Sequence, residues 1–342
     1  MGRVALPARA APAGRPSGRG RKARSAGAGA AEPVDMGHGD SLFSMQIPAM
    51  HPRFLWSALP LLLVAGCHAP RGGEPAGRLT VGHMRLVAAE SARTLARKES
   101  DAFLGLYREA RISLQARNTR GAVAALFADS ADAIIIPREV SAEEDSVARA
   151  NRLGLQGFRL AVDGVAVIVH PSNPVNQVAL DQLREVYLGQ LRDWARLGGT
   201  GGPIRALWQD PNSGSYELLV EKVLAGVPPV SARAWLSSDS AMVAEVARRP
   251  DALGFVSREA VRPGVKVLKV SEARGFPYYA PDQENLWNQK YPLRHFQVMV
   301  YRRPAPSVVD GFATFALSNE GQRVALDAGL VPTAVPLRIK RP

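Results

Sequence analysis

The segment Leu207-Trp208-Gln209-Asp210-Pro211-Asn212-Ser213-Gly214-Ser215-Tyr216-Glu217 carries the clearest structural signal in the chain. The apolar run over residues 204–208 predicts a strand, the residues after it predict a turn, and the apolar spacing over 216–224 predicts a helix. The turn places the hydroxyls of Ser213 and Ser215, with unpaired backbone N–H groups, at the positive end of that helix. These groups favour an anion. The alternative is that one serine only caps the helix.

Strands and helices alternate along the chain before this segment. Ser91 stands where a helix N-cap belongs, and Ser141 with Glu144 fits a capping box. The expected strands are residues 79–81, 111–115 and 131–136, and the expected helices begin near residues 92, 122 and 142. This order predicts a parallel, doubly wound α/β sheet that binds ligands at the carboxyl ends of its strands.

A long apolar stretch, residues 158–169, is interrupted only by Asp163-Gly164. We interpret it as a strand that leaves a first domain and enters a second. The elements expected after it are helices at 178–187, 241–247, 312–317 and 321–328, and strands at 253–257 and 295–301. A chain of 342 residues with 46% hydrophobic content is long enough for two such domains.

The net charge of +12 does not indicate nucleic-acid binding, because five of these charges precede Cys67 and the rest are dispersed. Residues 1–44 are rich in Ala, Gly, Pro, Arg and Ser, which predicts a disordered extension or a start site placed too early, with translation beginning at Met45 or Met50. Residues 68–77 are rich in Pro and Gly and predict a flexible tether.

Residues 45–67 have the features of an export signal. Arg53 precedes an apolar run, residues 54–64, that is too short to span a bilayer. Leu63-Val64-Ala65-Gly66-Cys67 resembles the bacterial lipobox, which implies acylation of Cys67 and a periplasmic or cell-surface lipoprotein. A small buried helix with a core cysteine is the alternative. Cys67 is the only cysteine, so the chain can form no internal disulfide.

An enzymatic function finds little support in the residues. His83, His170 and His295 show no metal-ligand spacing, and no Gly-x-Ser-x-Gly motif accompanies the serines. We therefore expect no catalytic activity, no metal and no cofactor.

Six segments, in order, resemble the substrate-binding proteins of phosphate ABC importers. The anion-loop segment is Asp210-Pro211-Asn212-Ser213-Gly214-Ser215, similar to the family's P-x-S-G-T. The other resembling segments are Asn173-Pro174 with residues 180–189, Trp194, Ala252-Leu253-Gly254-Phe255-Val256, Tyr291-Pro292-Leu293-Arg294, and residues 315–322 with Gly329-Leu330-Val331-Pro332. The similarity runs from about residue 79 to residue 336.

The resemblance implies a type II periplasmic-binding-protein fold, with two doubly wound α/β lobes joined by a two-strand hinge. Lobe one would comprise residues 78–160 and 270–342, lobe two residues 161–269, and the crossing strands residues 158–169 and 295–301. It also implies a monomer that captures a small oxyanion, phosphate above others, for an ABC permease while its lipid anchor holds it to a membrane. A ligand-sensing or adhesive lipoprotein with another ligand is the alternative.

In that family, hydroxyls, backbone N–H groups and usually an arginine hold the phosphate. The resemblance transfers Ser213, Gly214 and Ser215 directly, and Ser91, Thr119 and Arg138 lie on the loops that would supply further donors. Two positions depart from the pattern, because Glu90 brings a carboxylate to the first loop and Gln209 replaces the usual arginine. Arg120 would replace the missing charge from another direction.

Overall fold

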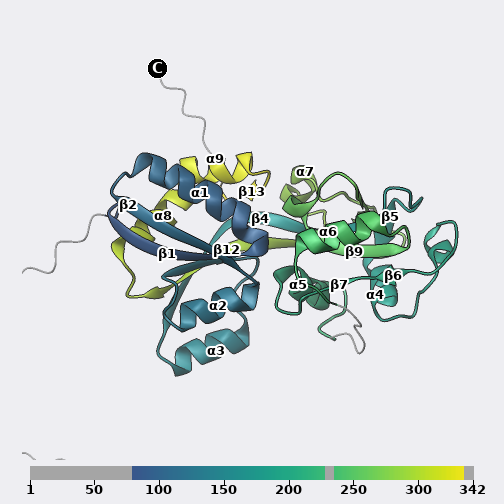
Figure 1. The fold of residues 1–342 in the computed structure, drawn as a ribbon, viewed down its shortest axis with the longest axis horizontal. Coiled ribbons are helices and arrows are strands. Elements are labelled where there is room, and N and C mark those ends of the chain that lie inside the picture. Colours follow the sequence, from purple (N-terminus) through teal and green to yellow (C-terminus); the bar gives the residue numbers. More distant parts are fainter. Residues whose placement is uncertain (1–78, 228–234, 335–342) are drawn as a thin grey trace, which may run out of the picture. The chain divides into compact units, whose positions relative to one another are not determined.

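The computed structural model describes residues 79–227 and 235–334, which belong to one compact unit (Figure 1). The expected extension, export signal and tether, with Cys67, lie outside these ranges. Within the described ranges, every helix is too short or too polar to cross a membrane.

The first group of elements is an α/β sheet with three parallel strands. β1 (Gly82–Ala89) pairs in parallel with β2 (Ala110–Arg117) on one side and with β3 (Ala133–Ile136) on the other. All four residues of β3 are buried, as expected for a strand inside a sheet that is covered on both faces. The intervening helices are α1 (Arg93–Leu106), α2 (Thr119–Phe127) and α3 (Ala142–Ala150).

Two expectations about the start of this group are wrong. Residues 79–81 form no strand; β1 begins at Gly82. Ser91 does not cap α1, because it lies inside a short 3₁₀ helix, Glu90–Ala92, while a capping residue needs an extended backbone. The Ser141–Glu144 capping box is confirmed: both of its hydrogen bonds are present at the start of α3.

Two strands pass between the groups of elements (Figure 1). In its first half, β4 (Gly154–Val169) pairs with β12 (Arg294–Arg303), which also pairs with β3. In its second half, β4 pairs with β9 (Ala252–Ser257). The Asp163-Gly164 interruption lies at the end of the segment of β4 that pairs with β12, opposite His295 and Arg294.

The second group is built around the buried strand β9. β6 (Arg205–Ala206) extends its sheet in parallel, and α6 (Asp239–Arg248) packs against it. Two small parallel pairs complete the group, β5 (Gln177–Ala179) with β11 (Lys269–Ser271) and β7 (Trp208–Gln209) with β8 (Trp235–Leu236). The remaining elements are α4 (Leu180–Tyr187), α5 (Gly214–Lys222), β10 (Lys266–Val267), α7 (Gln283–Trp287) and the 3₁₀ helices Trp194–Leu197 and Arg258–Ala260.

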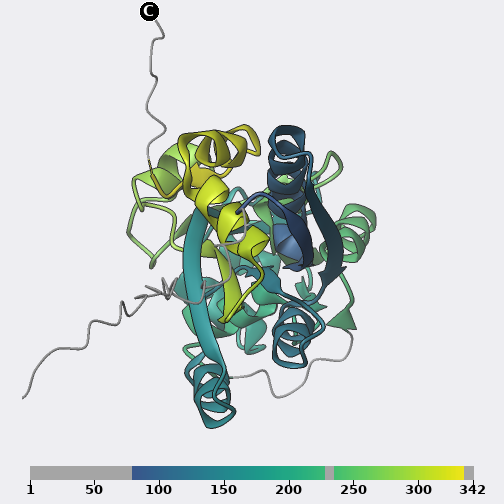
Figure 2. The same cartoon turned by 90° about the vertical axis from the view of Figure 1, so that its left-hand side faces the viewer.

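The chain returns to the first sheet through α8 (Ser307–Leu317), α9 (Asn319–Asp327) and β13 (Val331–Pro332), which pairs with β4. The rings of Phe103 in α1 and of Phe312 and Phe315 in α8 meet edge to face. Figures 1 and 2 show α1 and α9 on one face of this sheet and α2 and α3 on the other. The sheet is therefore covered by helices on both faces.

The buried apolar residues separate at the crossing strands. One core draws on residues 84–161 and 298–330, and the main core of the second group on residues 162–293 and Val331. We name the two halves lobe one and lobe two. The prediction that lobe one resumes at residue 270 is wrong, because Leu286, Tyr291 and Leu293 pack in the core of lobe two, where the Tyr291 hydroxyl donates to the Val165 carbonyl at 2.7 Å.

Candidate functional site

A small cavity is enclosed by loops of both lobes. Lobe one contributes Glu90, Ser91, Asn118 and Thr119, and lobe two contributes Gln209, residues 213–215 and residues 237–239. The space open to the centre of a water molecule is about 20 Å³, which exceeds the need of one water. A cavity of this size suits a small ion and is too small for a nucleotide or a peptide.

Three helices begin at this cavity. α2 begins after Asn118, whose side-chain oxygen accepts from the Gly121 N–H at 2.8 Å. α5 begins after Ser213 and α6 after Ser238, each of which also caps its helix through its side chain. A helix N-terminus carries a partial positive charge and unpaired N–H groups. The convergence of three such ends from two lobes makes the cavity favourable for an anion.

Ser213 acts as a cap, as the alternative interpretation of its segment proposed. Its hydroxyl oxygen accepts from the Tyr216 N–H at 3.2 Å and donates its proton to Gln209 Oε1 at 3.0 Å. Ser213 lines the cavity, but its hydroxyl proton is engaged by Gln209 in this arrangement, so its predicted ligand contact stays a prediction. Ser213 instead fixes the start of α5 beside the cavity.

Three other hydroxyls are free. The side chains of Ser91, Thr119 and Ser215 line the cavity with exposed fractions of 8%, 1% and 4%. None of these hydroxyls has a hydrogen-bond partner within residues 79–227 and 235–334. Their oxygens are not shut off from solvent, since none of them is among the buried polar atoms that lack a partner, so they open onto the cavity and can bond to water or a ligand there. All three are among the residues predicted from the sequence to bind a ligand, and the structure brings them together at one cavity.

Gly214 brings the two lobes into contact. A Cβ at this position would overlap the Cγ of Pro137 and lie 3.1 Å from Thr119 Oγ1, both in lobe one. The N–H groups of Gly214 and Ser215 lie in the first turn of α5, where a helix has no acceptor of its own for them. Glycine at 214 therefore allows close approach and leaves donors beside the cavity.

A carboxylate that the sequence analysis missed also lines the cavity. Asp239 accepts from Gln209 Nε2 through Oδ1 and from the Ser257 N–H through Oδ2 at 3.3 Å. Burial raises the pKa of Asp239 to about 6, with a smaller contribution from the nearby carboxylates of Glu90 and Asp163 and against the hydrogen bonds from Gln209 and Ser257, which lower it. Gln209 lines the cavity and holds Asp239, and its predicted contact with a ligand stays a prediction. The polar run before residue 241 was the signal for this helix start.

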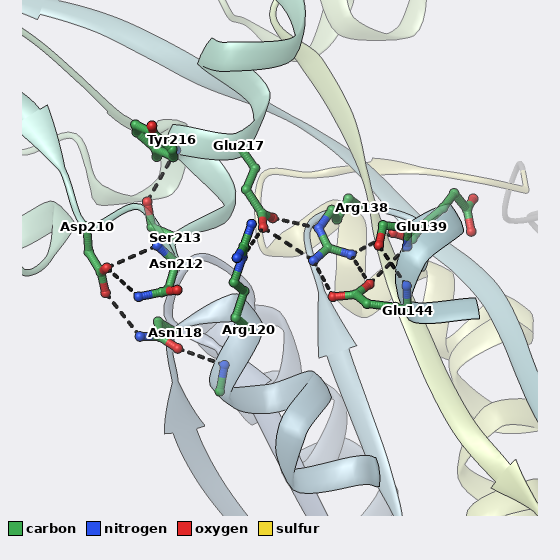
Figure 3. A network of polar contacts seen from close by, with 12 residues as sticks. Asn118, Arg120, Arg138, Glu139, Glu144, Asp210, Asn212, Ser213, Tyr216 and Glu217 are labelled. Atoms are coloured by element: carbon green, nitrogen blue, oxygen red, sulfur yellow. Dashed lines mark hydrogen bonds and ion pairs between the residues drawn. The ribbon is translucent and has the colours of Figure 1, made fainter. Parts of the chain in front are cut away.

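Arg120 and Arg138 do not line the cavity, which corrects their predicted role as ligand-binding cations. Arg138 Nε donates to Glu217 at 2.6 Å, and Arg120 Nε donates to Glu217 at 3.2 Å. Glu217 lies in the first turn of α5, and both guanidinium groups point to its carboxylate (Figure 3). Among the residues that the structure describes, no lysine or arginine side chain lines the cavity.

The lobes are also joined by hydrogen bonds next to the cavity. Asn118 Nδ2 donates to Asp210 Oδ2 at 3.0 Å, and the Arg120 N–H donates to the Asn212 carbonyl at 3.3 Å. Figure 3 shows the Asn118–Asp210 bond beside the Glu217 ion pairs. These bonds join the two lobes beside the cavity.

Comparisons with known proteins agree with this architecture. Residues 73–320, well over half of the chain, match the family model described as a PBP superfamily domain. The phosphate-binding protein PstS of Pseudomonas aeruginosa is 22% identical over 273 residues, which cover 73% of this chain and 83% of that protein.

Two solved structures share the fold. One is a putative phosphate ABC transporter substrate-binding protein from Clostridium perfringens with bound phosphate. It has a TM-score of 0.65 at 22% identity and covers 74% of this chain and 100% of that one. The other is an ABC-type phosphate transport receptor from Vibrio cholerae, with a TM-score of 0.60, 22% identity, and coverage of 72% and 99%. These likenesses confirm the predicted type II periplasmic-binding-protein fold, and the family match shows that the chain belongs to the PBP superfamily.

Proposed function

We propose that this protein binds phosphate in the cavity between its lobes, as the extracytoplasmic solute-binding component of an ABC importer. The observation that carries the proposal is a set of three cavity-lining hydroxyls without a partner in the described part of the chain, beside three converging helix starts. These hydroxyls belong to Ser91, Thr119 and Ser215. The names of the similar proteins from Pseudomonas aeruginosa and Clostridium perfringens, which refer to phosphate, support this choice of anion.

The hydrogen-bond donors at the cavity can replace the hydrogen bonds that an anion loses when it leaves water. Burying an ion costs several kcal/mol, while a hydrogen bond to a charged group contributes roughly 1.5–3 kcal/mol. Three hydroxyls and the first-turn N–H groups of α5 supply several such bonds, and the helix ends add favourable electrostatics. This donor set makes up for the missing arginine at position 209.

The carboxylates determine which oxyanion fits. Glu90 and Asp239 line the cavity and can accept hydrogen bonds but, when ionised, donate none. Phosphate near neutral pH still carries at least one O–H group, which a carboxylate can accept. Sulfate carries no O–H group at this pH, so its oxygens would face these carboxylates and be repelled. The cavity therefore favours phosphate over sulfate.

To deliver phosphate to an importer, the protein must be exported and must meet a permease in the membrane. The residue pattern over 45–67 supports an export signal, and the lipobox supports a lipid anchor at Cys67 that keeps the protein at a membrane surface. In this proposal a monomer closes on phosphate by a hinge motion about β4 and β12 and passes it to an ABC permease. Its role is binding, without catalysis.

A second candidate function is the sensing of another small ligand by the same cleft. It is favoured by one observation, the presence of two carboxylates and no cation among the described residues that line the cavity. Such a site would prefer a ligand with more hydrogen-bond donors than phosphate has. A titration with phosphate separates the two functions.

The test is calorimetric titration of the full chain with phosphate and then with sulfate, after any bound anion has been removed by partial unfolding and refolding. We expect phosphate to bind at micromolar concentration or below and sulfate to show no heat. Absence of phosphate binding would refute the proposal and favour the sensing function.

Ser215→Ala tests the site itself. Loss of one hydrogen bond to an anion, roughly 1.5–3 kcal/mol, should weaken phosphate binding by about 10- to 100-fold. Ser240→Ala, an exposed serine on α6, is the matched control and should bind as the wild type does. Equal phosphate affinities of the two variants would show that Ser215 does not contact the anion.

A further inference from the structure

Glu217 lies between two arginines of the opposite lobe. Its Oε2 accepts from Arg138 Nε at 2.6 Å, and its Oε1 accepts from Arg120 Nε at 3.2 Å (Figure 3). The side chains of Glu217 and Arg138 are only 17% and 21% exposed, whereas that of Arg120 is 64% exposed. Solvent and salt screen such a shielded pair less than an ordinary surface pair. We call the Arg138–Glu217 ion pair the latch.

Arg138 is already oriented within lobe one. Its Nη1 and Nη2 donate to the two carboxylate oxygens of Glu144 at 2.7 and 2.8 Å. Glu144 is itself held by the Ser141 N–H, which donates to it at 2.9 Å as part of the capping box of α3. Because this guanidinium is fixed beforehand, little side-chain entropy is lost when Glu217 arrives from lobe two.

The latch is separate from the cavity. Arg138 and Glu217 line a second hollow between the lobes, of about 720 Å³, and neither lines the small cavity. Gly214 borders both spaces, whereas Pro137, which a Cβ added at Gly214 would overlap, lines only the larger one. A change at the latch can therefore leave every cavity-lining side chain in place.

We infer that Arg138 and Glu217 are positioning residues, whose ion pair stabilises the closed lobes and so raises the affinity for an anion that neither residue touches. This inference rests on the proposed function. The donors come from both lobes, so an anion meets all of them only when the lobes are closed. The apparent dissociation constant is the intrinsic constant divided by the closed fraction, and the latch increases that fraction. Breaking it should also speed dissociation, because opening becomes easier.

The test compares Glu217→Gln, Arg138→Gln and the double variant with the wild type, by calorimetry and stopped-flow binding of inorganic phosphate to the full chain. We expect each single variant to bind about tenfold more weakly, mainly through faster dissociation, and the double variant to lose little more. Glu221→Gln, one turn further along α5 and paired only with its neighbour Lys222 among the described residues, is the control and should behave as the wild type. Unchanged affinity of Glu217→Gln, or fully additive losses, would overturn the inference.

A distance measurement separates failure of the latch from failure of phosphate binding. Spin labels at Glu143→Cys in lobe one and Arg196→Cys in lobe two, both exposed, report the lobe separation in a Cys67→Ser background. Glu217→Gln should lengthen or broaden this distance, whereas Glu221→Gln should not. If the wild type binds no phosphate but the distance still lengthens, the latch stands and the proposed function fails. An unchanged distance would overturn the latch.

Discussion

At the residue scale, the buried acid Glu99 on α1 is the least expected side chain of lobe one. It is fully buried, and neither carboxylate oxygen has a hydrogen-bond partner among the described residues. Burial without a partner raises the pKa of Glu99 to about 9, so the side chain is neutral in the folded protein near pH 7. An acid with a raised folded-state pKa destabilises the fold as pH rises from its unfolded value, near 4.3, toward the folded value.

Glu99→Gln should therefore stabilise the protein most at alkaline pH. The amide carries no charge in either state, so the loss of stability between about pH 5 and pH 9 should diminish. We expect the free energy of unfolding at pH 8 to rise by at least about 1 kcal/mol, measured by urea unfolding at several pH values. Glu109→Gln, an exposed acid beyond the same helix, is the control. Parallel pH profiles for the wild type and Glu99→Gln would contradict the assignment.

At the element scale, α5 connects the cavity, the contact between lobes and the latch. The cap Ser213 lies at the cavity, Gly214 makes room for the contact between the lobes, and Glu217 forms the latch. All three are close together because the first turn of a helix exposes its N–H groups and side chains at one place. The start of α5 must therefore fit closely against lobe one.

Gly214→Ala tests that fit. The added methyl group would overlap Pro137 and keep the lobes apart, so phosphate affinity should fall at least about tenfold, while thermal unfolding changes little because alanine suits a helix. Gly105→Ala on α1 is the matched control, since no atom lies within 4 Å of its new methyl group. It should raise stability slightly, leaving affinity unchanged. A Gly214→Ala protein with wild-type affinity would show that the lobes need not meet there.

At the scale of the whole molecule, β4 and β12 connect the two lobes. Asp163, fully buried in β4 at the crossing, accepts from Arg258 Nε of lobe two at 3.0 Å, and the same guanidinium binds the Gly329 carbonyl after α9. A buried carboxylate requires such a partner. This internal ion pair stabilises the region where β4 passes between the lobes, whereas the contacts of α2 and α5 join the lobes beside the cavity.

Because an anion in the cavity contacts both lobes, phosphate should stabilise the molecule as one unit. At a phosphate concentration 100 times the dissociation constant, the gain is about 2.7 kcal/mol, which should raise the melting temperature by roughly 5–10 °C. Differential scanning calorimetry in low-millimolar phosphate measures this shift, with equal ionic strength of sulfate as the control. An equal shift in sulfate would indicate a general salt effect and contradict the selectivity argument.

Much of the architecture follows from short-range patterns. The helix after Ser213, the capping box at Ser141 and the buried strand ending at Ile136 are all set by residues within a few positions of one another, so the sequence predicts them. The three cavity hydroxyls of Ser91, Thr119 and Ser215 also lie at predicted loops or helix starts, and their contact with a ligand stays a prediction.

The partners of charged side chains were decided only by the tertiary structure. Arg138 and Glu217 are 79 residues apart, and Gln209 and Asp239 are 30 apart, so no local pattern shows that the arginine faces a carboxylate or that the glutamine holds an acid at the cavity. The border of lobe two near residue 293 likewise depends on Tyr291 reaching Val165. The sequence by itself determined the elements and the Ser-Gly-Ser loop that lines the cavity, because periodicity and capping act between near neighbours. Folding alone determined the cavity's charge and closure, because those depend on contacts between distant segments.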